Sequence, residues 1–211
     1  MIIVLFGKPG AGKGTQAPLL AAKLAVPTLA TGDVLRAATR AGTPLGLEAK
    51  GFMDRGELVP DKVILGIVAE ELKKPEYARG AILDGVVRTV PQAEGLRSML
   101  ASLGRAVDAV LAFDVDNDEI VRRLGGRTVC ENCQTPYTGR EVGSVCSNCG
   151  GRLIRRKDDD PEAVRNRLRV YDEQTAPVLD WYQRDGTKVA VVNAVGAVHD
   201  VTARALTTIG A

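Results

Sequence analysis

The chain has 211 residues, of which 45% are hydrophobic and 26% are charged, and its formal net charge is +2. This length suffices for one substantial α/β core with small insertions, and a small basic excess suits anionic small ligands as well as nucleic acid. No stretch approaches the ~18 apolar residues of a membrane span, and the opening MIIVLF is too short for a signal peptide. We therefore expect a cytoplasmic protein with no membrane partner.

The chain opens with a strand, a loop and a helix. Residues 2–6 are a continuous apolar run, which is typical of a strand buried on both faces of a parallel sheet. A glycine-rich loop follows, and the pattern over 15–24 predicts a helix with Pro18 in its first turns. This order opens a βαβ fold. Further strand candidates are Ala81–Leu83, Val107–Phe113 and Lys188–Val192.

Helical patterns separate these strands. Asp116 or Asn117 can cap a helix that runs to about Leu124, and residues 161–183 predict a helix that is kinked or broken at Pro177. We therefore predict an α/β fold, a doubly wound parallel sheet of about five strands. Two segments interrupt the βα rhythm: a helical insertion over 30–60 and a small β-rich cysteine insertion over 126–160. The predicted core comprises 1–29, 61–125 and 161–211.

The loop from Gly7 to Thr15, GKPGAGKGT, carries the G-x-x-x-x-G-K core of a phosphate-binding loop. Its glycines let successive backbone N–H groups turn toward phosphate oxygens, and the helix that follows adds a partial positive charge. Lys13 can reach the β- and γ-phosphates of a nucleotide. Gly14 intervenes before Thr15, so the loop departs from the usual G-K-[ST] ending. The position between a buried strand and a helix favours a nucleotide site over a plain glycine-rich turn.

The cysteine insertion holds two C-x-x-C pairs, Cys130/Cys133 and Cys146/Cys149, which twelve residues separate. Two such pairs can surround one tetrahedral Zn²⁺, with iron as the alternative metal. Disulfides are disfavoured in a reducing cytosol. All four ligands come from the protein, which leaves no open position for catalysis, so we predict a structural zinc site. An insertion of about thirty residues is too short to form a hydrophobic core of its own, and the bound metal would stabilise it instead.

The loop variant G-x-P-G-A-G-K-G-T resembles that of the adenylate kinases, a family of nucleoside monophosphate kinases. The likeness continues in order along essentially the whole chain. Residues 31–36 (TGDVLR) resemble the family's T-G-D-x-L-R, and Leu83-Asp84-Gly85 followed by Arg88 resembles its L-D-G-F-P-R. The cysteine insertion is similar to the zinc-binding lid that some members carry.

This resemblance implies a P-loop sheet core, an AMP-binding helical insertion and a zinc-binding β lid. It implies reversible phosphoryl transfer from Mg-ATP to AMP, giving two ADP, in line and without a covalent enzyme intermediate. The partners would be ATP, AMP and ADP, and the cofactors Mg²⁺ and a structural Zn²⁺. We expect a monomer that binds no nucleic acid.

The resemblance also assigns the site residues. The catalytic residues would be Lys13, Asp84, Arg88, Arg123, Arg156 and Arg167. ATP would be bound by Gly10, Ala11, Gly12, Lys13, Gly14, Thr15, Arg123, Arg127, Pro136, Tyr137 and Gly196. AMP would be bound by Thr31, Arg36, Glu57, Leu58, Val59, Gly85, Val86, Val87, Arg88, Gln92, Arg156 and Arg167. Asp33 and Asp84 would hold Mg²⁺ through its water shell, as Mg²⁺ prefers.

These residue types suit phosphoryl transfer. The second pKa of a phosphate monoester lies near ~6, so AMP is largely dianionic at neutral pH and needs no general base. The reaction relies instead on positioning two polyanions and neutralising their charge. Arginine is suited to this task because it binds phosphate oxygens bidentately and keeps its charge. Asp158 and Asp159 can pair with such arginines or stay solvated.

Two positions depart from the family pattern. Val86-Val87 replaces Phe-Pro, where the family's proline follows a cis peptide bond. A cis bond before any other residue costs ~3 kcal/mol, so we predict a trans bond. The backbone that places Gly85 and Arg88 then takes another path, which we expect to loosen the AMP site more than the ATP site. Lys8 stands where the family commonly has a small residue.

Three other functions remain open at this stage. A kinase for UMP or CMP would share the loop and the arginines, although Thr31 and Gln92 favour adenine. A zinc-ribbon nucleic-acid-binding NTPase would need exposed aromatics or a dense basic stripe, whereas aromatics are 4% of this chain. A nucleotide-binding protein without catalysis is disfavoured by the retention of Lys13, Arg88 and Arg156.

Overall fold

A parallel β-sheet forms the centre of the computed structural model, which describes residues 1–211 apart from the side chain of Leu45. The sheet has five strands in the order β2-β3-β1-β4-β8, and every neighbouring pair is parallel. The strands are β1 (Ile2–Phe6), β2 (Thr28–Ala30), β3 (Ala81–Asp84), β4 (Ala109–Asp114) and β8 (Lys188–Asn193). This arrangement confirms the predicted α/β fold.

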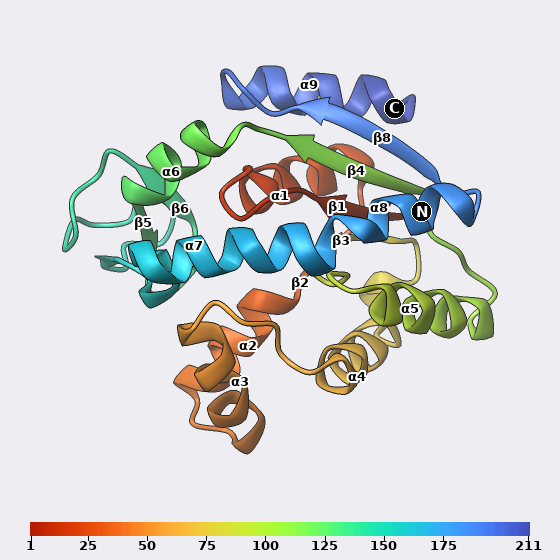
Figure 1. The fold of residues 1–211 in the computed structure, drawn as a ribbon, viewed down its shortest axis with the longest axis horizontal. Helices are drawn as coiled ribbons and strands as arrows, with labels where there is room; N and C mark the ends of the chain where they lie inside the picture. Colours follow the sequence, from red (N-terminus) through yellow and green to blue (C-terminus); the bar gives the residue numbers. More distant parts are fainter.

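Helices cover both faces of the sheet (Figure 1). They are α1 (Lys13–Leu24), α2 (Thr31–Arg40), α3 (Pro44–Asp54), α4 (Asp61–Leu72), α5 (Val90–Ser102), α6 (Asn117–Gly125), α7 (Pro161–Val170), α8 (Pro177–Arg184) and α9 (Val198–Ile209). In the part of the chain that the structure describes, none of them is long and apolar enough to cross a membrane.

The core has one apolar cluster on each face of the sheet, and β1 shows why. Ile2, Val4 and Phe6 join the cluster that includes α4, α5 and α8, whereas Ile3 and Leu5 join the cluster that includes α1 and α9. Successive side chains of a strand point to opposite faces, so a continuous apolar run is needed to fill both.

The two predicted insertions have separate folds. The helical insertion contains α2 and α3, which pack on each other beside α4 (Figure 1). The cysteine insertion forms a three-stranded antiparallel sheet in the order β6-β5-β7, at the opposite end of the molecule from α5. Its strands are β5 (Arg127–Cys130), β6 (Pro136–Thr138) and β7 (Leu153–Ile154).

The predicted core elements agree with the structure within a few residues at their ends, with one difference. The three-residue edge strand β2 was not among the predicted strands, because TLA carries too little pattern to stand out. The break that was predicted at Pro177 is present, and it takes the form of a π-helical turn, Tyr171–Thr175, just before α8. Pro177 has no N–H to continue the α-helical ladder, and the N–H of Ala176 donates instead to Tyr171 O at 2.8 Å.

The contact between α2 and α3 depends on the absence of a side chain at Gly46. A Cβ there would overlap the backbone carbonyl group of Ala38. We expect Gly46→Ala to lower the free energy of unfolding by about 1–3 kcal/mol, because α3 must move away from α2. Gly66→Ala in α4 is the matched control, since a Cβ there meets open space. It should raise stability by about 0.5–1 kcal/mol. Equal changes in melting temperature would contradict this packing.

Candidate active site

The phosphate-binding loop lies at the carboxyl end of β1, the strand at which the sheet order changes direction. Ligands of open α/β sheets bind at such a switch point. Gly10 and Gly12 have positive φ angles of 85° and 98°, which the curled loop requires and which glycine adopts readily. The loop forms one wall of a solvent-open cleft of about 1650 Å³.

Lys13 begins α1, and its ammonium group turns back into the loop. Nζ donates to the carbonyl oxygen of Gly7 at 2.6 Å and to that of Lys8 at 3.1 Å. Burial lowers the pKa of Lys13 to about 8, although the nearby charge of Asp84 opposes this shift. Burial also raises the pKa of Asp84. Both charges are therefore poorly solvated, which strengthens their interaction with any ligand that enters.

Arginines from the cysteine insertion and from α7 face the loop across the cleft. Nε of Arg127 donates to Asp159 at 2.8 Å, and Nη1 of Arg167 lies 3.0 Å from Oδ2 of Asp158. Of the two alternatives that the sequence left open for these aspartates, pairing with arginines is the one present in the structure. Burial acts to raise the pKa of Asp158, but the surrounding arginines outweigh it and the pKa is lowered.

Two buried guanidinium groups have donors to spare. Among the described residues around the cleft, Nε of Arg36 and Nε of Arg156 are buried and meet no acceptor. Burial, followed by the charge of Arg36, lowers the pKa of Arg156 to about 10. Arg156 also lies 4.0 Å from Asp33 of α2. Buried donors are normally satisfied, so these two point to an anionic ligand that accepts from them.

A smaller pocket of about 600 Å³ opens between the helical insertion and the end of β3. Gly85 O accepts from Thr31 Oγ1 at 2.9 Å and from Nε of Arg88 at 3.2 Å. Gln92 is buried in the first turn of α5. The structure therefore brings nine of the predicted AMP-binding residues to this pocket: Thr31, Arg36, Glu57, Leu58, Val59, Gly85, Arg88, Gln92 and Arg167.

The peptide bond between Val86 and Val87 is trans, as predicted, since the described residues contain no cis bond. Both valines are buried, with exposed fractions of 0% and 3%, and belong to the core cluster beneath the pocket. Val87 lines a neighbouring cavity together with Tyr171 and Thr175. The expected loosening of the AMP site at this segment stays a prediction.

The other end of the large cleft is formed by α6 and the segment before α9. Arg123 donates to Ala194 O at 2.9 Å and to Ala11 O at 3.4 Å, so it joins the phosphate-binding loop to that segment. Gly196 and Pro136 line the cleft, as do the predicted residues of the loop, Asp33, Asp84, Arg127 and Arg156. Tyr137 is placed differently: its hydroxyl contacts Cys146 Sγ at 3.1 Å, and its side chain lies on the cysteine cluster.

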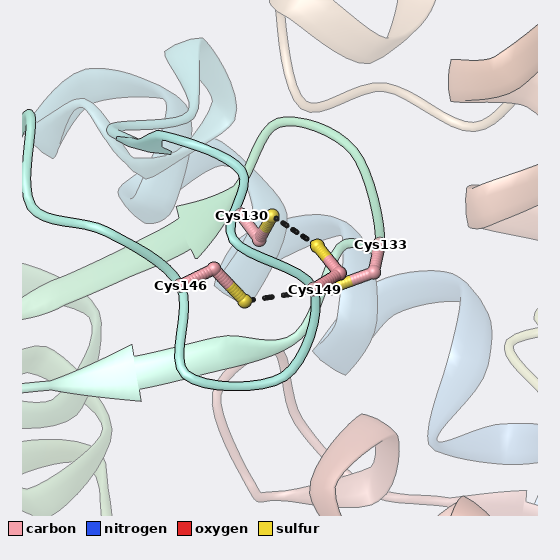
Figure 2. Close-up of side chains that lie close together, drawn as sticks. All are labelled: Cys130, Cys133, Cys146 and Cys149. Atoms are coloured by element: carbon pink, nitrogen blue, oxygen red, sulfur yellow. Dashed lines mark hydrogen bonds between the residues drawn. The ribbon is translucent and has the colours of Figure 1, made fainter.

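The four cysteine sulfur atoms converge in the cysteine insertion (Figure 2). All four lie within 4.8 Å of one another, with 3.4 Å between Cys130 and Cys149 and 3.6 Å between Cys133 and Cys146. A tetrahedron of Zn–S bonds of ~2.3 Å has edges of ~3.8 Å, so these separations fit a single zinc ion. Asn148 N donates to Cys146 Sγ, as is common beside thiolate ligands.

The sequence analysis missed two residues that connect the elements around the large cleft and the smaller pocket, Gln16 and Asp61. Gln16 donates to Val198 O at 2.9 Å and accepts from Thr202 at 2.7 Å, which joins the first turn of α1 to α9. Asp61 accepts from Gln92 and Thr89 at the smaller pocket. The Gln16 position directly after the loop was a usable signal. Asp61 gave none, because its partners lie 28 and 31 residues away.

A sheet with a phosphate-binding loop at its switch point, facing buried arginines over two adjoining pockets, defines a P-loop phosphotransferase of nucleotides. Comparison with known proteins then gives the family. The adenylate kinase family model matches residues 5–187. The chain belongs to the adenylate kinase family.

Individual relatives agree with this assignment. An adenylate kinase of Gemmatimonas aurantiaca is 62% identical over 208 residues, which cover 98% of this chain and 97% of that protein. An adenylate kinase of Salinispora tropica is 46% identical over 210 residues, covering 98% and 96%. An adenylate kinase of Methanothrix thermoacetophila is 46% identical over 205 residues, covering 95% and 94%. The predicted enzyme class is therefore confirmed.

The lowered pKa of Lys13 predicts a pH-dependent affinity for ATP. Anionic phosphates favour the charged ammonium group, so binding raises its pKa from about 8 and takes up a proton. The affinity should be full below pH 8 and fall by up to about tenfold per unit above it. Titration calorimetry without divalent ions, from pH 7 to 9.5, measures this. Lys13→Arg is the control because arginine does not titrate there. A pH-independent wild-type affinity would contradict the burial of Lys13.

Proposed function

We propose that this chain transfers the γ-phosphoryl group of Mg-ATP directly to AMP, reversibly giving two ADP, by in-line displacement without a covalent enzyme intermediate. Membership of the adenylate kinase family supports the two substrates. The observation that carries the mechanism is the ring of buried cations around the junction of the two pockets, in which Arg36 and Arg156 have unused donors.

Each nucleotide has its own pocket in this proposal. The phosphates of ATP lie on the loop from Gly10 to Thr15, with Lys13 on the β- and γ-phosphates and Arg123 and Gly196 toward the base. From the cysteine insertion, Arg127 covers the phosphates and Pro136 lies toward the ribose and base, whereas Tyr137 stays on the cysteine cluster. AMP lies in the smaller pocket, and its phosphate binds Arg36 and Arg88.

The transfer step needs charge neutralisation more than proton transfer. The dianionic phosphate of AMP attacks the γ-phosphorus, and the bond to the β-γ bridging oxygen breaks, leaving ADP on both sides. Arg156 and Arg167 contact the transferring group, and Lys13 offsets the charge that develops on the bridging oxygen. The spare buried donors stabilise these oxygens without a change in their own solvation.

Two metals fit the donor sets. Asp84 lies 3.5 Å from the place where a side chain on Gly14 would begin, so its carboxylate borders the loop and can hold the water shell of Mg²⁺, together with Asp33. Bound there, Mg²⁺ would neutralise part of the phosphate charge of ATP. The four thiolates would hold Zn²⁺ as a structural ion, because they fill its tetrahedral shell.

The division into a core, an AMP-binding insertion (30–60) and a zinc-binding lid (126–160) belongs to the same proposal. Cytoplasmic location and a monomeric state follow from it as expectations. Initial rates with AMP, CMP, UMP and GMP test the choice of acceptor, and AMP should be preferred.

Lys13→Ala should lower kcat for ADP formation by a factor of hundreds while the protein stays folded, because transition-state charge stabilisation of this kind is worth ~3–4 kcal/mol. A coupled assay of ADP formed from ATP and AMP gives the rate. Lys8→Ala is the matched control: its side chain is bonded to Asn117 Oδ1 at 2.7 Å outside the cleft, and its carbonyl survives the change. A near-normal kcat in Lys13→Ala would contradict the proposed role of Lys13 in transition-state stabilisation.

Metal removal should destabilise the cysteine insertion. That insertion has an apolar cluster of Cys130, Cys146 and Leu153 with Tyr137 against it, which is too small to hold three short strands. Cys130→Ser with Cys133→Ser, or chelation, should release about one metal per chain and lower the melting temperature. Glu141→Gln, an exposed change in the same insertion, should do neither. Protein purified without chelators that contains neither zinc nor iron would refute the site.

A further inference from the structure

Gln92 is held at both ends of its side-chain amide. It is 1% exposed, and it lines the smaller pocket. Oε1 accepts from the backbone N–H of Arg88 at 2.7 Å, and Nε2 donates to Oδ1 of Asp61 at 2.7 Å. A primary amide has two N–H donors and two acceptor lone pairs. One donor and one acceptor are therefore left for a ligand in the pocket.

The two partners fix which end of the amide is which. A backbone N–H can only donate, and an ionised carboxylate can only accept. Rotating the amide by 180° would bring its NH₂ group against the N–H of Arg88 and its oxygen against the carboxylate of Asp61. Both contacts would become repulsive, so a single orientation of Gln92 is stable.

Asp61 is itself held in place by a second helix. It lies in the first turn of α4, and both of its carboxylate oxygens lie 3.2 Å from Thr89 Oγ1. Thr89 is the N-cap of α5, where its hydroxyl accepts from Gln92 N at 3.2 Å. The carboxylate thus joins α4 to the start of α5 at the edge of the pocket.

A fixed amide distinguishes bases by the order of their hydrogen-bonding groups. Adenine offers an N–H donor on its 6-amino group beside the acceptor N1, which complements the free lone pair of Oε1 and the free N–H of Nε2. Hypoxanthine, guanine and uracil offer an acceptor beside an N–H donor, which is the reverse order. When such a base binds, the free lone pair and the free N–H of the Gln92 amide stay buried without a partner, and this cost lowers the affinity for that base.

We propose that Asp61 is a positioning residue that locks the amide of Gln92 in the orientation that selects adenine over 6-oxopurines and uracil in the acceptor pocket. This rests on the proposed function, in which the smaller pocket takes AMP. Cytosine presents the same order as adenine, so the lock does not act against it.

The test compares AMP with IMP, because the two differ only in the group on carbon 6 and the proton on N1. In Asp61→Asn the side chain keeps its shape but can donate as well as accept, so only the backbone N–H of Arg88 still opposes the reversed orientation of Gln92. We expect the ratio of kcat/KM for AMP to that for IMP to fall on the order of tenfold, as for loss of one hydrogen bond to a charged group. The KM for ATP should change by less than about twofold, because ATP loses no hydrogen bond in this variant. Asp61→Ala, which removes the acceptor altogether, is the second variant and should lower the ratio as well.

Thr89→Val separates the lock from the helix cap. It removes the hydroxyl that caps α5 but leaves the bond between Asp61 and Gln92, so the melting temperature should fall while the AMP-to-IMP ratio stays as in the wild type. Equal loss of activity on AMP and IMP in both Asp61 variants would overturn the inference and leave the proposed function standing. A wild-type protein that does not phosphorylate AMP would overturn both.

Discussion

Mutual repulsion among buried cations is the constraint on which this structure depends. Lys13, Arg36, Arg156 and Arg167 lie around one cleft, and burial lowers the pKa of Lys13, Arg156 and Arg167. Asp158 and Asp159 offset part of this charge through Arg127 and Arg167, Asp33 pairs with Arg36, and the charge of Asp84 acts on Lys13. The remainder is offset only when an anion enters, so the same feature that destabilises the empty cleft gives it affinity for two phosphorylated nucleotides.

The fold supplies these charges from three directions. The adjacent strands β1 and β3 end side by side, and this brings Lys13, at the start of α1 after the loop, close to Asp84 at the end of β3. The helical insertion contributes Arg36 from α2, the cysteine insertion contributes Arg127 and Arg156, and α7 contributes Arg167. A cysteine cluster that holds a metal makes so small an insertion rigid enough to present an arginine.

The sequence predicted the framework better than the connections within it. The loop after β1, the cysteine pairs and four of the five strands of the parallel sheet were readable, because each depends on a local pattern of glycine, cysteine or apolar residues. The π-turn before α8 and the position of Tyr137 on the cysteines were not, since both result from packing. The hydrogen bond between Asp61 and Gln92 was not predictable either. The two residues are 31 positions apart in the chain, and they meet only because α4 packs against α5.

The central claim is that the cleft is electrostatically incomplete until phosphates enter it. Melting temperature measured at fixed ionic strength tests this most directly, with three ligands at equal concentration: adenosine, ATP, and two adenosines joined by five phosphates. The account predicts little stabilisation by adenosine, more by ATP, and the most by the dinucleotide, which would reach from Lys13 to Arg36. Stabilisation that is the same for adenosine and for the pentaphosphate dinucleotide would contradict it.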